Sequence, residues 1–252
     1  MFLHNYHTHT TRSHHANGTD REYVEAAIQA GFKTLGFSDH APYIYPIGNS
    51  EPQMRIFLED TGDYVSSIRA LAKEYANDIR ILCGFELEYY PLFHADEMAY
   101  LRSFPHDYRI MGQHFMKNQI PPIPNSALRL DKDLAAYVSQ VLEGLATGDF
   151  LYLAHPDFPG SFCSEQAVQK EYRRLCEGVK RMQIPLEFNL LGVRQHRHYP
   201  CEAFWKIAAE VGNEVVLGAD AHSPDALLQT GEDTALETIE RLGLKVRTTA
   251  LL

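Results

Sequence analysis

Long apolar runs are missing from this chain, and cysteine is scarce. No segment approaches the roughly 20 apolar residues that a transmembrane helix requires, and the first residues lack the cationic and apolar stretches of a signal peptide. The four cysteines include no CxxC pair, so they are better interpreted as free thiols than as a disulfide framework. We therefore expect a cytoplasmic protein that does not enter a membrane.

Basic residues are outnumbered by acidic ones, at 23 Lys and Arg against 33 Asp and Glu, and the net charge is -10. This balance gives no basic surface of the kind that attracts long nucleic acids. A small phosphate ester is still a possible substrate, because divalent cations bound in a cleft reverse the local potential. We expect a small-molecule partner, and the composition indicates no oligomeric state.

Short apolar runs alternate with amphipathic stretches along all 252 residues. The apolar runs predict strands at residues 2–6, 34–37, 79–85, 108–111, 150–154, 184–188 and 215–217. The amphipathic stretches predict helices at residues 22–30, 64–76, 134–146, 166–182, 202–211 and 226–242. Thr19 and Glu22 form a capping-box pattern at the start of the first helix. Repeated βα units predict an α/β fold with a parallel sheet, open or closed into a barrel, in one domain spanning residues 1–252.

Potential metal ligands follow nearly every predicted strand. They are His7 and His9, Asp39 and His40, Glu86, His114, His155, and Asp220 with His222. The carboxyl ends of parallel strands open on one face, so these side chains are expected to converge there. One histidine at a strand end is more often a hydrogen-bonded structural residue, but a structural explanation must account for each buried polar group separately. Their recurrence favours a metal site.

The mixture of imidazole and carboxylate suits Zn, Mn or Fe, and the lack of a thiolate cluster argues against a structural zinc site. Such ions generate hydroxide near neutral pH and stabilise charge on a phosphoryl oxygen. Two choices stay open. His14 and His15 are adjacent, and only one is expected to point inward. Glu88 shares a strand face with Glu86, where it either contacts the site or forms a salt bridge at the rim.

Arg194 follows the one predicted strand that has no imidazole at its end. A guanidinium there suits two phosphate oxygens in a planar fork, although an isolated arginine is more often a surface residue. A Pro-rich segment at residues 119–124 lies between a strand and a helix, which predicts a loop at the rim of the site.

Six short motifs together resemble the PHP phosphoesterase superfamily. They lie at residues 6–10, 37–40, 84–86, 112–115, 154–156 and 218–223. Residues 39–42, 155–157 and 189–194 look most like the monofunctional histidinol-phosphate phosphatases. The resemblance runs through the whole chain and implies a distorted (β/α)7 TIM-like barrel with three divalent ions at the strand C-termini.

The resemblance also implies which residues hold each ion. One ion would be bound by His7, His9, Glu86 and Asp220. Glu86 would bridge to a second ion bound by His114 and His155, and a third would be bound by His15, His40 and His222. His15 is preferred to His14 because the family's ligand in this loop lies eight residues after the first histidine.

By similarity, the reaction would be hydrolysis of L-histidinol phosphate to L-histidinol and phosphate in histidine biosynthesis. A hydroxide bridging the first two ions would attack phosphorus, while the third ion and Arg194 hold the non-bridging oxygens. Asp157 or a metal-bound water would protonate the leaving alkoxide. Glu88, Asn189 and Asp157 are candidates to recognise the amino and imidazole groups of the substrate.

Three other functions are weighed against this one. The first is a PHP phosphoesterase acting on a nucleotide or another small phosphate ester, with the same metal site. The second is a metal-binding protein without turnover, which the complete ligand set opposes. The third is a metallohydrolase of the amidohydrolase type, which Glu86 opposes because it stands where a bridging lysine would be expected.

Overall fold

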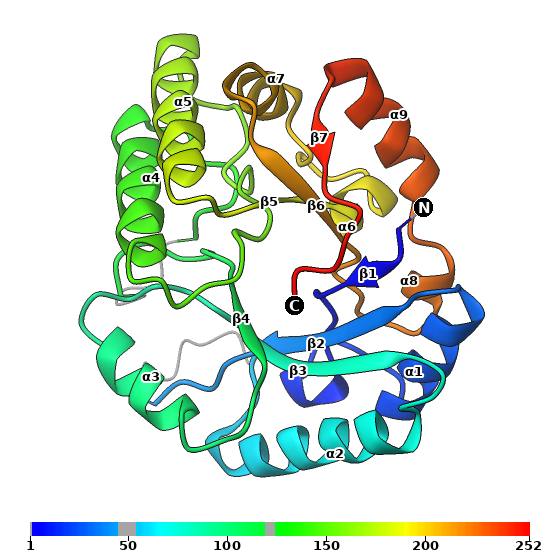
Figure 1. Ribbon diagram of the computed structural model, residues 1–252. Helices are drawn as coiled ribbons and strands as arrows, with labels where there is room; N and C mark the ends of the chain where they lie inside the picture. Colours follow the sequence, from blue (N-terminus) through cyan, green and yellow to red (C-terminus); the bar gives the residue numbers. More distant parts are fainter. Residues whose placement is uncertain (1, 45–53, 119–123) are drawn as a thin grey trace.

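Parallel strands form the centre of the protein, and helices surround them (Figure 1). The computed structural model describes residues 2–44, 54–118 and 124–252. β1 (His4–Asn5), β2 (Thr34–His40), β3 (Arg80–Leu87) and β4 (Tyr108–Met111) pair in that order. β5 (Leu186–Asn189), β6 (Glu214–Gly218) and β7 (Lys245–Val246) form a second set. All pairings between these strands are parallel.

Single bridges join the two sets of strands into a distorted barrel. Leu153 bridges Met111 at the end of β4 and also Leu186 at the start of β5. On the opposite side, Thr8 beyond β1 bridges Ala221 beyond β6. The segment predicted as a strand at residues 150–154 thus holds a strand position, although the structure reduces it to one bridging residue. The predicted α/β class and barrel-like curl of the parallel sheet are confirmed.

Helices cover the outside of the barrel. The longer ones are α1 (Asp20–Gln29), α2 (Thr61–Glu74), α4 (Asp131–Leu145), α5 (Glu165–Arg181), α7 (Glu202–Val211) and α9 (Glu232–Leu242). Each corresponds to a predicted helix, because an apolar stripe on one side packs against the strands or a neighbouring helix. At the start of α1, Thr19 accepts a hydrogen bond from the amide of Glu22, whose carboxylate accepts one from the amide of Thr19. The predicted capping box is therefore formed.

The structure contains several short elements that the sequence pattern does not predict. They are α3 (His94–Leu101), α6 (Leu190–Arg194), β7 and the 3-10 turns at Thr11–Ser13 and Leu58–Asp60. The predicted helix at residues 226–242 is divided into α8 (Asp225–Leu228) and α9, because Gly231 has a φ of 77° that an α-helix cannot contain. Most of these elements are too short to show a periodic pattern.

Aromatic and aliphatic side chains fill the inside of the barrel. This buried cluster consists of Tyr6, Leu82, Tyr108, Ile110, Tyr152, Ala154 and Val216. The hydroxyl of Tyr108 lies 2.7 Å from the carbonyl oxygen of Tyr6 and 2.9 Å from that of Phe37, so it joins β4 to β2 and to the segment just after β1. Because the interior is packed, ligands reach the barrel only at its ends.

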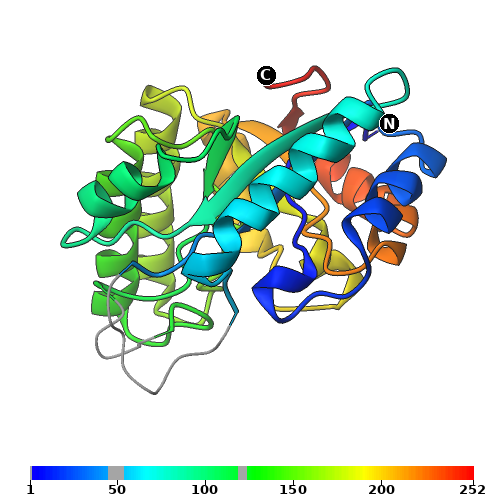
Figure 2. The ribbon, with the colours of Figure 1, turned by 90° about the horizontal axis from the view of Figure 1, so that it is seen from below.

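Both chain ends lie at the end of the barrel where the strands begin (Figure 2). The amide of Leu251 donates to the Tyr6 hydroxyl at 2.8 Å, and Arg80 at the start of β3 donates to the carbonyl of Leu252. Among the described residues, the helices include none with the length and apolar character needed to cross a bilayer. The predicted ligands lie at the opposite end.

Candidate metal centre

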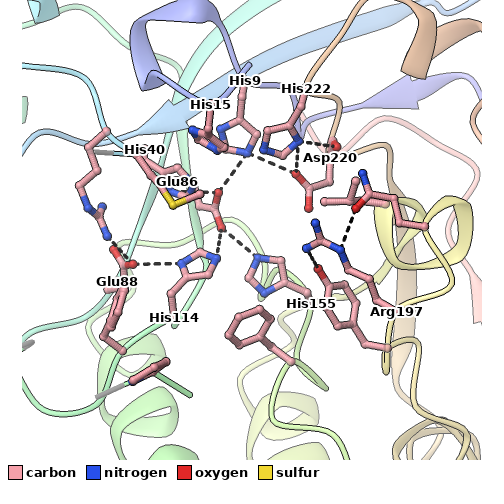
Figure 3. Close-up of a pocket in the computed structure, with 18 of the residues that line it drawn as sticks. His9, His15, His40, Glu86, Glu88, His114, His155, Arg197, Asp220 and His222 are labelled. Carbon is pink, nitrogen blue, oxygen red and sulfur yellow. Dashed lines mark hydrogen bonds and ion pairs between the residues drawn. The ribbon is translucent and has the colours of Figure 1, made fainter. Parts of the chain in front are cut away.

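The carboxyl ends of the strands bring together all nine side chains that are predicted to bind metal. His7, His9 and His15 follow β1, His40 ends β2, and Glu86 lies near the end of β3. His114 follows β4, His155 follows the Leu153 bridge, and Asp220 and His222 follow β6. Figure 3 shows most of them around the carboxylate of Glu86. Their role as ligands stays a prediction, but their convergence is a property of the fold.

Glu86 is the centre of this arrangement, and its carboxylate is almost completely buried. Its Oε2 lies 3.1 Å from Nε2 of His7, 3.3 Å from Nε2 of His9 and 3.3 Å from Nδ1 of His40. Its Oε1 lies 3.0 Å from Nε2 of His155 and 3.5 Å from Nε2 of His114. One carboxylate thus faces five imidazoles through both oxygens, which is the arrangement expected of a bridging ligand.

Asp220 adds a second carboxylate on the other side of His7 and His9. Its Oδ1 lies 3.5 Å from Nε2 of His7, 3.3 Å from Nε2 of His9 and 3.4 Å from Nδ1 of His222. Asp220 has a φ of 45° and His155 a φ of 27°. A positive φ is costly for residues other than glycine, and such strain is concentrated at functional sites.

The backbone decides between the two adjacent histidines of the first loop. His14 has a φ of 61°, which turns its ring outward onto Phe57 at 4.2 Å between centroids. The ring of His15 lies 4.6 Å from that of His222 and 5.3 Å from those of His9 and His40. The structure therefore brings His15, and not His14, to the cluster.

The donor atoms fit a set of divalent ions. Groups of three residues place their ligand atoms within 4.8 Å of one another, among them His7 with His9 and Glu86, and His40 with Glu86 and His114. Two buried polar atoms that face the cluster have no hydrogen-bond partner among the described residues, namely Nδ1 of His40 and Oδ1 of Asp220. Buried polar atoms without partners are unfavourable, so a bound cation accounts for them best.

Burial and neighbouring charges set the ionisation of the cluster. Burial, followed by the charge of His9, lowers the pKa of His222 to about 3. Burial likewise lowers the pKa of His40 well below its usual value. Burial alone would raise the pKa of Glu86, but the imidazoles around it, His40 first, bring that pKa well below the usual value. Neutral imidazoles at His40 and His222 and an ionised carboxylate at Glu86 are the forms that bind metal.

A cavity of about 430 Å³ opens over these residues. The rest of its wall consists of Tyr43, Met54, Arg55, Glu88, Phe115, Pro124, Phe158, Leu191, Gln195, Arg197 and Tyr199. Nε of Arg197 donates to Oε1 of Gln195 at 2.9 Å, and its NH1 donates to the hydroxyl of Tyr199 at 2.8 Å, which orients the guanidinium beside Asp220 (Figure 3). Of the predicted Pro-rich rim, residues 119–123 lie outside the described residues.

Arg194, which is predicted to hold the phosphate, contacts backbone carbonyls in the structure. Its guanidinium donates to the backbone carbonyls of Ala219 at 2.8 Å, Asp220 at 3.2 Å and Thr230 at 3.3 Å. Arg194 is absent from the described cavity wall, where Arg197 stands instead. The reason is local: α6 carries Leu191 at the cavity wall, but it directs the side chain of Arg194 toward the loop after β6.

Asp157 and Asn189, which are predicted to contact the substrate, do not line the described cavity wall either. The Asp157 carboxylate is buried, accepts hydrogen bonds from the amide of Cys201 and from Nε1 of Trp205, and lies behind the wall. Burial raises the pKa of Asp157 to about 6. Nδ2 of Asn189 donates at 3.0 Å to Oδ2 of Asp220, so Asn189 supports a candidate ligand from behind the cavity wall.

Glu88 does line the cavity, and it also supports the cluster. Its Oε1 lies 3.0 Å from Nδ1 of His114, and the same oxygen forms an ion pair with Arg55. The guanidinium of Arg55 lies 4.2 Å from the centre of the Tyr43 ring. Sequence reasoning missed Arg55 because it follows no predicted strand, and it missed Arg197 because a turn separates that residue from β5. Both could have been found only from tertiary structure.

Comparisons with known proteins agree with this geometry. The PHP domain family matches residues 5–242. A probable histidinol-phosphatase of Deinococcus radiodurans is 31% identical over 225 residues, which cover 86% of this chain and 85% of that protein. The histidinol-phosphatase of Bacillus subtilis is 30% identical over 124 residues, covering 48% of this chain and 44% of that protein.

Two solved structures have the same fold. A putative histidinol phosphatase from Listeria monocytogenes superposes with a TM-score of 0.78 at 20% identity, covering 92% of this chain and 99% of that one. A histidinol phosphate phosphatase from Lactococcus lactis, complexed with Zn, L-histidinol and phosphate, gives a TM-score of 0.71 at 17% identity over 97% of this chain and 95% of that one. The chain, with its barrel and its cluster of histidines and carboxylates, belongs to the PHP domain family.

Proposed function

We propose that this protein is a metal-dependent phosphomonoesterase that hydrolyses L-histidinol phosphate to L-histidinol and phosphate. The observation that carries the proposal is the Glu86 carboxylate, which faces five imidazoles at the base of a cavity whose wall includes Arg197. The substrate follows from the relative in Deinococcus radiodurans, a probable histidinol-phosphatase that aligns with most of this chain.

We propose three divalent ions, of Zn, Mn or Fe. His7, His9, Glu86 and Asp220 would hold the first, and Glu86, His114 and His155 the second. His15, His40 and His222 would hold the third. Support comes from the overlapping groups of ligand atoms, three of which are His7–His9–Glu86, His40–Glu86–His114 and His9–His15–His40. Bound ions of this kind supply an activated water near neutral pH and neutralise charge on the phosphoryl oxygens.

The protein's own side chains would orient the phosphate. Arg197 is fixed by Gln195 and Tyr199, so its planar guanidinium can bind two phosphate oxygens without losing much freedom of rotation. We assign to Arg197 the role predicted for Arg194. The loop that carries Asp220 is fixed in turn by Arg194, which is therefore a supporting residue.

The organic part of the substrate would occupy the aromatic side of the cavity. Tyr43, Phe115, Phe158 and Tyr199 line it, and its volume of about 430 Å³ is in the range of small-molecule sites. His114 and Arg55 both interact with Oε1 of Glu88. We propose Oε2 of Glu88 as the acceptor for the amino group of histidinol phosphate.

The test is a steady-state comparison of L-histidinol phosphate with nucleotide and sugar phosphates. Enzyme reconstituted separately with Zn, Mn and Fe is expected to give the highest kcat/KM with histidinol phosphate. A higher kcat/KM for a nucleotide would favour a different PHP phosphoesterase. If neither histidinol phosphate nor an aryl phosphate releases phosphate, the result would favour a metal-binding protein without turnover.

A further inference from the structure

A buried glutamate on β5 contacts two of the candidate ligand residues directly and a third through Asn189, without lining the cavity. Glu187 has no exposed surface, and its carboxylate accepts four hydrogen bonds. We infer that Glu187 is a positioning residue of the proposed metal centre. It fixes His7 and the backbone of His155 directly, and Asp220 through Asn189, so it sets the affinity for the ion that these residues hold. This inference rests on the metal centre of the proposed function.

The four hydrogen bonds use every acceptor position of the carboxylate. Oε1 lies 2.8 Å from Nδ1 of His7 and 3.2 Å from the hydroxyl of Tyr152. Oε2 accepts from the amide of His155 at 3.0 Å and from Nδ2 of Asn189 at 3.0 Å. An ionised carboxylate has about four acceptor sites, and here each oxygen faces two donors. A neutral amide in its place would turn an NH2 group toward two of these donors.

The contact with Nδ1 fixes which nitrogen of His7 is available to a cation. When Nδ1 carries the proton and donates it to Glu187, the lone pair is on Nε2, which lies 3.1 Å from Oε2 of Glu86 and 3.5 Å from Oδ1 of Asp220. A carboxylate behind a ligating imidazole holds its orientation and raises its basicity. Glu187 stands in that relation to His7.

The other two contacts reach the residues with unusual backbones. His155 has a φ of 27° and Asp220 a φ of 45°, and both follow strands that flank β5 in the barrel. Oε2 of Glu187 accepts the amide of His155, and Asn189 donates one hydrogen bond to Glu187 and one to Oδ2 of Asp220. Strained backbone conformations persist only where surrounding contacts stabilise them, and the hydrogen bonds of Glu187 are among these contacts.

The space and the charge around Glu187 both set this residue apart from an ordinary buried glutamate. A Cβ built on Gly218 of the adjacent strand would overlap Oε1 and Cδ of Glu187 and lie 2.8 Å from Cγ, so Gly218 leaves the space that the carboxylate occupies. The described residues that donate to Glu187 include neither Lys nor Arg. A buried carboxylate needs positive charge nearby, and a divalent cation held by His7 would provide it.

The experiment compares Glu187→Gln with Glu171→Gln, a matched change at a buried glutamate on α5 that pairs with Arg174 and lies outside the cluster. Zn affinity is measured by competition with a chelator, and bound Zn is counted after dialysis. Glu187→Gln is expected to weaken Zn binding by about 10- to 100-fold, while Glu171→Gln changes it less than twofold. Circular dichroism of the metal-free proteins verifies folding. Wild-type affinity in a folded Glu187→Gln variant would overturn the inference.

If Glu187→Gln does not fold, the wild-type protein still provides a test. Nuclear magnetic resonance of ¹⁵N-labelled, Zn-loaded enzyme is expected to show the His7 ring protonated at Nδ1. A ring protonated at Nε2 would overturn the inference. Wild-type protein that binds no Zn would refute the metal centre itself, whereas protein that binds Zn but leaves histidinol phosphate intact would refute only the proposed substrate.

Discussion

Gly112, just beyond β4, leaves the space in which the carboxylate of Glu86 lies. A Cβ built on Gly112 would overlap Oε1 of Glu86 and lie 2.8 Å from its Cδ and 3.0 Å from Cε1 of His114. A side chain at position 112 would therefore move the carboxylate that faces five imidazoles. The observed position of Glu86 therefore requires glycine at position 112.

Gly112→Ala is expected to displace Glu86, and thereby to lower both bound metal and kcat by at least about tenfold, as loss of a supporting contact does at metal sites. Metal analysis and steady-state kinetics measure the two effects. Gly62→Ala is the control: it lies in α2, its new Cβ would meet only Phe104 at 3.8 Å, and helix propensity predicts a gain of up to about 1 kcal/mol in stability. Full metal content in Gly112→Ala would show that Glu86 has room to move.

Arg197→Ala is expected to lower kcat/KM for histidinol phosphate by about 10- to 100-fold, because a charged hydrogen-bond donor is worth about 1.5–3 kcal/mol. Metal content should not change, since the hydrogen bonds of Arg197 go to Gln195 and Tyr199, and neither of these is a candidate ligand. Kinetics and metal analysis on the same preparation check both statements.

Arg194→Ala should act differently, because it removes the donor to three backbone carbonyls. We expect a loss of about 1–3 kcal/mol in the free energy of unfolding, measured by urea denaturation, with a smaller effect on KM than Arg197→Ala has. If Arg194→Ala raises KM more than Arg197→Ala does, the exchange of roles between the two arginines is incorrect.

A buried carboxylate away from the cluster predicts a pH dependence of stability. Burial, partly offset by Arg55 and reinforced by Glu88, raises the pKa of Glu97 from 4.5 to about 8, and Oε2 of Glu97 has no hydrogen-bond partner in the described structure. Between these two values the folded protein binds a proton that the unfolded chain has released, so stability falls as the pH rises. At about 1.4 kcal/mol per pH unit, the upper limit of this loss is about 5 kcal/mol.

Glu97→Gln should remove this loss. Its free energy of unfolding is expected to match that of the wild type near pH 4.5 and to exceed it by a few kcal/mol at pH 8 and above. Asp96→Asn, at an exposed position of the same helix, is the control and should leave the pH profile unchanged. Parallel profiles for Glu97→Gln and the wild type would mean that Glu97 is ionised throughout.

The sequence predicts the convergence of the candidate ligands because this convergence depends mainly on topology. Residues at the ends of parallel strands, such as His40 and Glu86, become neighbours whatever the helices between them do. Arg197 and Glu187 carry no such signal. The place of Arg197 depends on how α6 ends, and Glu187 is indistinguishable in sequence from any other polar residue of a strand until His7 and His155 are seen to donate to it.

Local backbone conformation explains the remaining differences. The choice between His14 and His15 depends on a left-handed conformation at His14, which no periodic pattern reveals. Asp157 immediately follows the motif that contains His155, yet the turn after His155 directs its carboxylate to the amide of Cys201 and the indole of Trp205. Proximity in sequence to a ligand therefore did not place Asp157 in the cavity.

The most direct test of the proposed metal-dependent phosphatase is a titration of chelator-treated protein with Zn, Mn or Fe. Phosphate release from L-histidinol phosphate and bound metal are measured at each step. We expect no turnover without metal, and activity that rises with bound ions and reaches its maximum near three per chain. Undiminished hydrolysis by the metal-free protein, or maximal activity with a single ion, would contradict this mechanism.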